Sequence, residues 1–104
     1  MVTSDFKIKL IDFGFALALS GRKGTGYMKS KLGTPMYMAP EIQDKTVPYQ
    51  GTDADIFALG VTLFVARVMA YPWKKPDIIS DARYILFAGD NGIDADDFWA
   101  KFRN

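Results

Sequence analysis

GTPMYMAPE fills residues 33–41 of this chain of 104 residues, and the fold assignment depends on it. The string DFG, residues 12–14, comes about twenty residues before it, and DIFALG, residues 55–60, comes after it. An isolated Asp-Phe-Gly is a weak signal, because the same letters suit any strand that ends in a turn. Three such strings in this order and at this spacing form a far more specific pattern.

The composition excludes several classes of protein. Hydrophobic residues make up 49% of the chain and charged residues 24%, which is typical of a folded domain. The net charge of +1 predicts no nucleic-acid partner. Because the chain contains neither cysteine nor histidine, it has no disulfide, no zinc site of the Cys/His type and no histidine-based triad.

The chain has no sequence feature of a membrane or secreted protein. Its longest apolar run, IFALGVTLFVA at residues 56–66, is shorter than the ~20 residues of a membrane span. The first residues alternate with lysines and contain no apolar core of a signal peptide. Since the absence of cysteine also suits a reducing compartment, we predict an intracellular, cytoplasmic protein without a membrane segment.

Local patterns predict a short strand followed by a loop and a long helix. Residues 6–10 alternate apolar side chains with lysines, as in a strand with one wet face. Glycine, lysine, serine and threonine then dominate residues 17–32 and indicate a loop. Pro40 favours a short helix at its own position.

The strongest helix signal runs from Thr52 to about Met69. Thr52 or Asp53 can cap its N-terminus, and the charge of Asp53 suits the positive end of the helix dipole. Apolar residues lie on nearly all of its faces, which is typical of a helix surrounded by protein.

Two shorter helices are predicted near the C-terminus. The first begins at Ser80 or Asp81 and ends before Gly89, which can occupy the C-terminal cap. The second starts near Asp94 and carries the aromatic pair at residues 98–99.

The three strings together show which family the chain is similar to. From Lys7 to about Phe102 the sequence resembles the C-terminal lobe of the eukaryotic protein kinases. The resemblance implies a mainly α fold, a partial protein-kinase-like lobe with a short N-terminal β-strand, an activation loop and a buried central helix. It makes residues 1–104 part of one kinase domain, with the N-lobe, the catalytic loop and the last helices outside the chain. We therefore expect part of the cover of the central helix to be missing.

The resemblance implies a nucleotide and magnesium site at residues 12–14. Asp12 corresponds to the carboxylate that binds Mg²⁺ between the phosphates of ATP, a hard oxygen ligand for a hard cation. Phe13 would pack under the regulatory helix of the N-lobe, and Gly14 would let the loop move. Residues 12–41 become the activation segment.

In the same resemblance, Gly33, Thr34 and Tyr37 belong to the loop that receives the protein substrate. The Thr34 hydroxyl is expected beside the catalytic aspartate, which makes Thr34 the catalytic candidate of this chain. Glu41 is expected in a buried ion pair, and Asp55 as a buried acceptor for amides of the catalytic loop. The sequence Gly-Thr-Pro at residues 33–35 favours serine/threonine over tyrosine specificity.

Thr25 and Ser30 are candidate phosphorylation sites in the loop, because neighbouring lysines and arginines can pair with an added phosphate. The alternative is an ordinary solvated loop face. Two further strings predict no site. GRKGTG, residues 21–26, does not follow a strand as a phosphate-binding loop must, and DNGIDADD, residues 90–97, lacks the glycine position of a calcium loop.

These inferences predict a serine/threonine protein kinase that uses ATP and Mg²⁺ to phosphorylate protein substrates. The glycine-rich loop, its partner lysine and the catalytic aspartate of such an enzyme do not occur in the 104 residues. The chain alone is therefore expected to be inactive and to need the remainder of the kinase domain. Two alternatives stay open: a catalytically silent binding module that uses the surface around Tyr84 and Trp99, and a decayed gene fragment.

Overall fold

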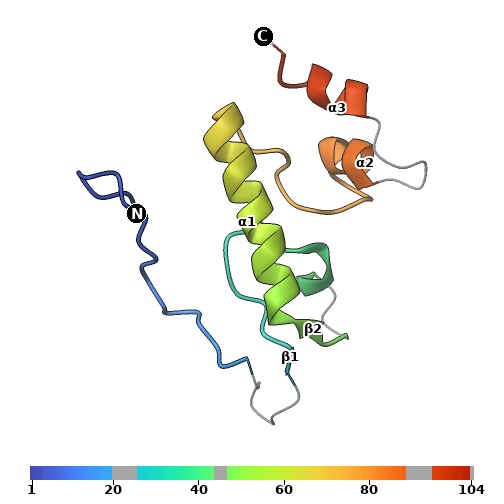
Figure 1. Cartoon of the computed structure of the whole chain (residues 1–104). Coiled ribbons are helices and arrows are strands. Elements are labelled where there is room, and N and C mark those ends of the chain that lie inside the picture. Colours follow the sequence, from blue (N-terminus) through green and yellow to red (C-terminus); the bar gives the residue numbers. More distant parts are fainter. Residues whose placement is uncertain (20–25, 44–46, 89–94, 104) are drawn as a thin grey trace.

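The computed structural model describes residues 1–19, 26–43, 47–88 and 95–103. Within these ranges lie the α-helices α1 (Gly51–Val68), α2 (Ala82–Ala88) and α3 (Ala95–Ala100), and the short 3-10 helix η1 (Pro40–Ile42). Two short strands, β1 (Tyr27–Met28) and β2 (Tyr49–Gln50), pair antiparallel, with Tyr27 opposite Gln50. The expected mainly helical fold is confirmed (Figure 1).

The long helix α1 begins one residue earlier than predicted, and it has no side-chain cap. Gln50 occupies the N-cap position in extended backbone and makes no capping hydrogen bond, so the predicted caps at Thr52 or Asp53 are wrong. Strand β2 runs directly into α1, and its pairing with β1 fixes the entry of the chain in place of a cap.

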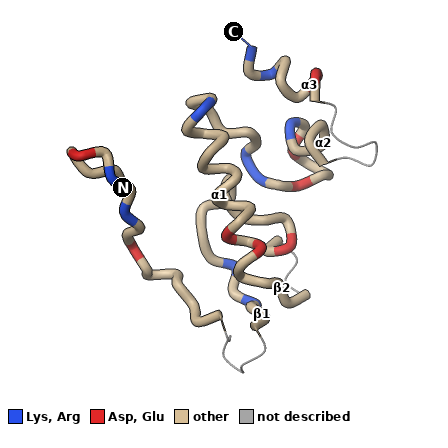
Figure 2. The backbone as a smooth tube through the Cα atoms, viewed as in Figure 1, with Lys and Arg blue, Asp and Glu red and all other residues tan. Residues whose placement is uncertain are grey.

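The two ends of α1 follow ordinary helix electrostatics. Asp53 lies in the first turn and Arg67 in the last, where their charges oppose the helix dipole. Figure 2 shows acidic residues at the start of α1 and a basic residue near its end. The helix ends where Met69 adopts left-handed backbone (φ 59°) and donates its N–H to the carbonyl oxygen of Val65 at 2.8 Å. Among the described residues, no helix combines the length and the apolar character that crossing a membrane requires.

Two clusters of buried side chains lie along one face of α1. The smaller one surrounds η1 and consists of Met38, Ala39, Ile42 and Ala54. The larger one joins α1 to the following loop, to α2 and to α3, and consists of Val61, Trp73, Tyr84 and Phe98. Because aromatic side chains bury the most apolar area, the second cluster is the main contact among the three helices.

The opposite face of α1 is open to solvent. Ile56, Leu59 and Leu63 project there, and the first of them is 68% exposed. The radius of gyration is 15.6 Å, whereas a compact chain of this length has about 13 Å. Within the part of the chain that the structure describes, the central helix is thus buried along one face only.

The predicted strand at residues 6–10 is wrong. The chain instead reverses direction, and Val2 and Ile8 form a single antiparallel bridge. The Thr3 hydroxyl accepts the N–H of Lys7 at 3.0 Å, and left-handed backbone at Phe6 (φ 59°) interrupts any extended run. The apolar side chains of this stretch stay exposed because none of the described helices packs against them (Figure 1).

Candidate active site

Asp12 lies in an exposed turn whose geometry presents its carboxylate to solvent. Its backbone is left-handed (φ 62°), a conformation that aspartate and asparagine tolerate better than most residues. Its Oδ1 atom accepts the N–H of Gly14 at 3.2 Å. A Cβ atom on Gly14 would also lie 3.2 Å from that oxygen, so glycine keeps the turn open. Oδ2 of Asp12 makes no hydrogen bond that competes with an incoming cation among the described contacts.

Among the described residues, Asp12 can supply one ligand to a magnesium ion, and no further ligand lies beside it. Mg²⁺ is usually held by one or two carboxylates together with substrate phosphates, and Asp12 can supply one carboxylate. Nowhere in the described ranges do three or more acidic or other ligating side chains gather closely enough to hold a metal by themselves. Phe13, beside Asp12, is 70% exposed and does not pack on the helices.

The predicted substrate loop is an exposed turn with a buried end. Gly33 has a φ of 129°, which favours glycine strongly. The N–H of Tyr37 bonds to the carbonyl oxygen of Thr34 at 3.0 Å and closes the turn. Directly after it, Ala39 is completely buried in the cluster around η1. The Thr34 side chain is therefore displayed at the surface on a segment that the core anchors.

Tyr37 is the half-buried member of this loop. Its ring meets the ring of Tyr71 edge-on, with 5.7 Å between the centroids. A hydrogen bond with Tyr71 raises the pKa of the Tyr37 phenol above its ordinary value, and partial burial raises this pKa further, to a smaller degree. The predicted substrate loop thus contacts the chain segment that follows α1.

Glu41 is solvent-exposed in η1 and forms no ion pair among the described residues. The buried ion pair that the resemblance implies belongs to a complete domain and stays a prediction. The pKa of Tyr84 is raised by burial and, to a smaller degree, by the negative charge of Glu41. No described segment covers the outer side of η1, and the carboxylate consequently keeps its water.

Asp55 is also exposed. Its role as a buried acceptor for amides of the catalytic loop therefore stays a prediction for the complete domain. It lies in the part of α1 that no other described element covers. Burial and, secondarily, the charge of Asp55 raise the pKa of Tyr49. The Tyr49 hydroxyl donates a hydrogen bond of 2.6 Å to the carbonyl oxygen of Ser30 and so joins β2 to the loop after β1.

Of the two candidate phosphorylation sites, only Ser30 lies within the described residues. Thr25 lies outside the described residues, as do Gly89 and the first part of the acidic run up to Asp94. Ser30 is partly buried beside Tyr49. The alternative binding surface around Tyr84 and Trp99 is only half available, because Tyr84 is 4% exposed whereas Trp99 is 43% exposed.

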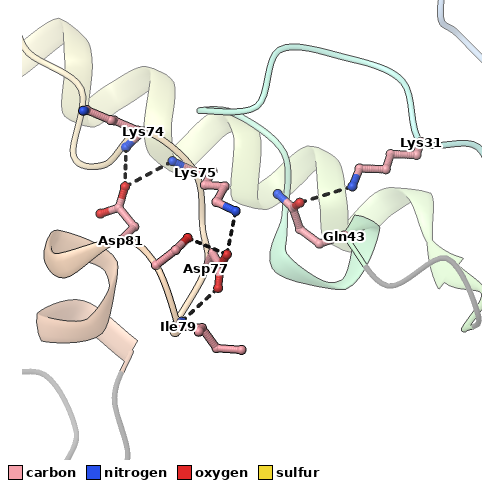
Figure 3. Close-up of polar contacts among 8 residues, drawn as sticks. Lys31, Gln43, Lys74, Lys75, Asp77, Ile79 and Asp81 are labelled. Atoms are coloured by element: carbon pink, nitrogen blue, oxygen red, sulfur yellow. Dashed lines mark hydrogen bonds and ion pairs between the residues drawn. The ribbon is translucent and has the colours of Figure 1, made fainter.

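Asp81 is a structural residue whose importance the sequence did not reveal. Its Oδ2 accepts the backbone N–H groups of Lys74 and Lys75 at 2.8 and 3.3 Å (Figure 3). Its Oδ1 accepts those of Arg83 and Tyr84, both at 3.1 Å, and thereby caps α2. The sequence predicted that α2 begins at Ser80 or Asp81, but nothing in the pattern indicated the link to the loop.

The ionisation of Asp81 follows from these contacts. Burial raises the pKa of its carboxyl, but the four backbone hydrogen bonds together outweigh burial and hold the pKa below the ordinary value of 3.8. The carboxylate therefore stays charged and ties the loop after α1 to the start of α2.

The exposed turn at Asp12, the loop that ends at the buried Ala39 and the long helix α1 follow one another in the order that the resemblance predicts. Comparison with known proteins agrees. The model of the family described as "Protein kinase domain" matches residues 1–93. The chain belongs to the protein kinase family.

The most similar curated proteins include named serine/threonine kinases of plants. Serine/threonine-protein kinase SAPK7 of Oryza sativa subsp. japonica is 39% identical over 71 residues, which cover 68% of this chain and 19% of that protein. Serine/threonine-protein kinase SRK2C of Arabidopsis thaliana is 38% identical over 79 residues, 74% of this chain and 21% of that protein. The chain spans about a fifth of the length of these relatives.

Proposed function

We propose that residues 1–104 form part of the C-terminal lobe of a serine/threonine protein kinase, which transfers the γ-phosphoryl group of ATP to protein substrates. The observation that carries this proposal is the loop from Gly33 to Ala39. It presents the Thr34 hydroxyl on an exposed turn, and a fully buried residue fixes its end. The named relatives are serine/threonine kinases, and the Gly-Thr-Pro wording of the loop favours the same specificity.

Asp12 supplies a ligand for Mg²⁺ in this proposal, and residues 12–41 form the activation segment. The metal would neutralise the charge of the phosphates of ATP when bound. The residues of this chain bind the metal and orient the substrate. Asp12 supplies one oxygen ligand from its turn, and the Thr34 hydroxyl lies at the entrance of the substrate site. Glu41 and Asp55 would gain their buried partners only from other parts of the domain. Thr25 and Ser30 remain candidates for a phosphorylation switch that orders the loop.

Thr34 gives the sharpest test of this assignment. In a kinase domain completed with the upstream and downstream coding sequence, Thr34→Val should lower kcat by about tenfold or more, because one polar contact near the transferred group is lost. Thr34→Ser keeps the hydroxyl and should stay within about threefold of the parent. Because the side chain at position 34 is exposed, neither substitution should change the melting temperature.

The measurement is steady-state phosphorylation of matched serine, threonine and tyrosine peptides with Mg²⁺ and ATP. The parent domain should modify the serine and threonine peptides and leave the tyrosine peptide unmodified. Equal kcat values for the valine and serine variants would show that the Thr34 hydroxyl has no role in the site. A preference for the tyrosine peptide would refute the proposed specificity.

A further inference from the structure

The segment Tyr71-Pro72-Trp73, which follows α1, contacts the proposed substrate loop at two points. The first contact is a hydrogen bond: Nε1 of Trp73 donates to the carbonyl oxygen of Met36 at 3.2 Å, across 37 positions of the sequence. The second is the edge-on contact of the Tyr71 and Tyr37 rings. Between the two, Pro72 is fully buried. The loop therefore rests on a segment that cannot shift independently of the core.

The indole of Trp73 is held by aromatic side chains from two helices. Phe57 of α1 lies 5.7 Å from it, and Tyr84 of α2 packs edge-on at 4.9 Å. Phe87, also from α2, lies at 5.1 Å. Trp73 itself is 5% exposed. These contacts fix the direction in which its N–H group points.

The same segment is tied to α2 by polar contacts. Nη1 of Arg83 donates to the carbonyl oxygen of Tyr71 at 3.2 Å. Asp81 binds the backbone N–H groups of Lys74 and Lys75, which follow Trp73 directly. Anchors therefore lie on both sides of Trp73, and the donor that reaches the substrate loop has little freedom to move.

We propose that Trp73 is a positioning residue for the protein substrate: its N–H group holds the carbonyl of Met36 and thereby sets the place of Thr34 and Tyr37 relative to the helices. The inference rests on the proposed function, because it assigns a purpose to the substrate loop of that function. A phenylalanine at this position would fill most of the same space but would lack the donor. Small displacements of positioned groups have large effects on phosphoryl transfer, which depends on geometry.

Trp73→Phe in the completed kinase domain tests the inference, with Trp99→Phe as the matched control. The control makes the same chemical change on the half-exposed indole of α3, which has no contact with the substrate loop among the described residues. Trp73→Phe should raise KM for a peptide substrate about three- to tenfold while KM for ATP stays within twofold. Trp99→Phe should change neither constant.

Amide hydrogen exchange in the same proteins provides a second readout. Trp73→Phe should speed exchange of a peptide covering residues 33–39 by about two- to tenfold, the range that one ordinary hydrogen bond supports, and leave residues 95–103 unchanged. Unchanged exchange, or faster exchange without a rise in peptide KM, would overturn the inference. An inactive parent domain would refute the proposed function instead, and exchange of residues 33–39 would then decide alone whether Trp73 holds the loop.

Discussion

Replacing Asp12 with asparagine in the completed kinase domain is expected to lower phosphoryl transfer by at least about a hundredfold, ~2.7 kcal/mol of activation free energy. A bound Mg²⁺ ion supplies several kcal/mol of charge stabilisation to the transition state of such a reaction, and a carboxylate ligand holds the ion in place. Asparagine keeps a carbonyl oxygen but carries no charge, so it binds the cation far more weakly.

The same substitution should leave the fold intact. Asparagine tolerates the left-handed backbone of Asp12 (φ 62°), and its side-chain oxygen can still accept the N–H of Gly14. The position is exposed, so no buried group loses a partner. The melting temperature of the variant should therefore match that of the parent.

Asp5→Asn is the matched control. Asp5 lies in the same segment and is exposed, but its oxygens contact Thr3 and Lys7 rather than the turn at Gly14. Activity assays with both variants, at saturating and at limiting Mg²⁺, distinguish a metal ligand from a surface charge. Full activity of Asp12→Asn, or equal losses in the two variants, would show that Asp12 does not bind the metal.

The second large effect is expected at Asp81. Asp81→Ala removes the acceptor of four backbone N–H groups and should lower the free energy of unfolding of the completed domain by about 2–4 kcal/mol. Asp81→Asn should cost less. Its oxygen can still cap α2, but its NH₂ group would then face the N–H groups of Lys74 and Lys75, which are donors as well.

Asp77→Asn serves as the control for Asp81. Asp77 lies in the same loop and pairs with Lys75 at the surface, where solvent screens the interaction, so its loss should shift the unfolding midpoint much less. Chemical denaturation monitored by tryptophan fluorescence gives the comparison. Equal losses for the Asp77 and Asp81 variants would contradict the role of Asp81 as the tie between the loop and α2.

The contribution of Asp81 should depend on pH in a defined direction. Its folded-state pKa lies below 3.8, so the contribution is fully present above about pH 4 and is lost as the pH falls through the folded-state pKa. The Asp81→Ala variant lacks this titration, and the difference in stability between variant and parent should shrink below about pH 4.

The sequence predicted those parts of the fold that local signals determine. The long helix was expected from its continuous apolar run and lies within a residue of the predicted bounds, Gly51–Val68. The helix that Asp81 caps was also predicted, because an acceptor followed by an apolar run is an ordinary N-terminal signal. The three strings assigned the family, and residues 1–93 match it.

Features that depend on distant neighbours were not predicted. Alternation at residues 6–10 indicates a strand only where a second strand is available, and no described segment pairs with it beyond the single bridge at Ile8. The burial of Glu41 and Asp55 was inferred from a complete domain, and both are exposed here. The bond from Trp73 to Met36 spans 37 positions, and no local pattern encodes a contact of that range.

The most direct measurement is phosphoryl transfer from labelled ATP, with Mg²⁺, to a basic serine peptide, made in parallel with the 104-residue chain and with the completed domain. The completed domain should label the peptide. The chain alone should be at least about a hundredfold slower, because one carboxylate without the catalytic base and the phosphate-binding loop leaves most of the electrostatic stabilisation unassembled. Turnover by the chain alone within a hundredfold of the completed domain, or no labelling by the completed domain, would contradict the proposal that this chain is one part of a serine/threonine kinase.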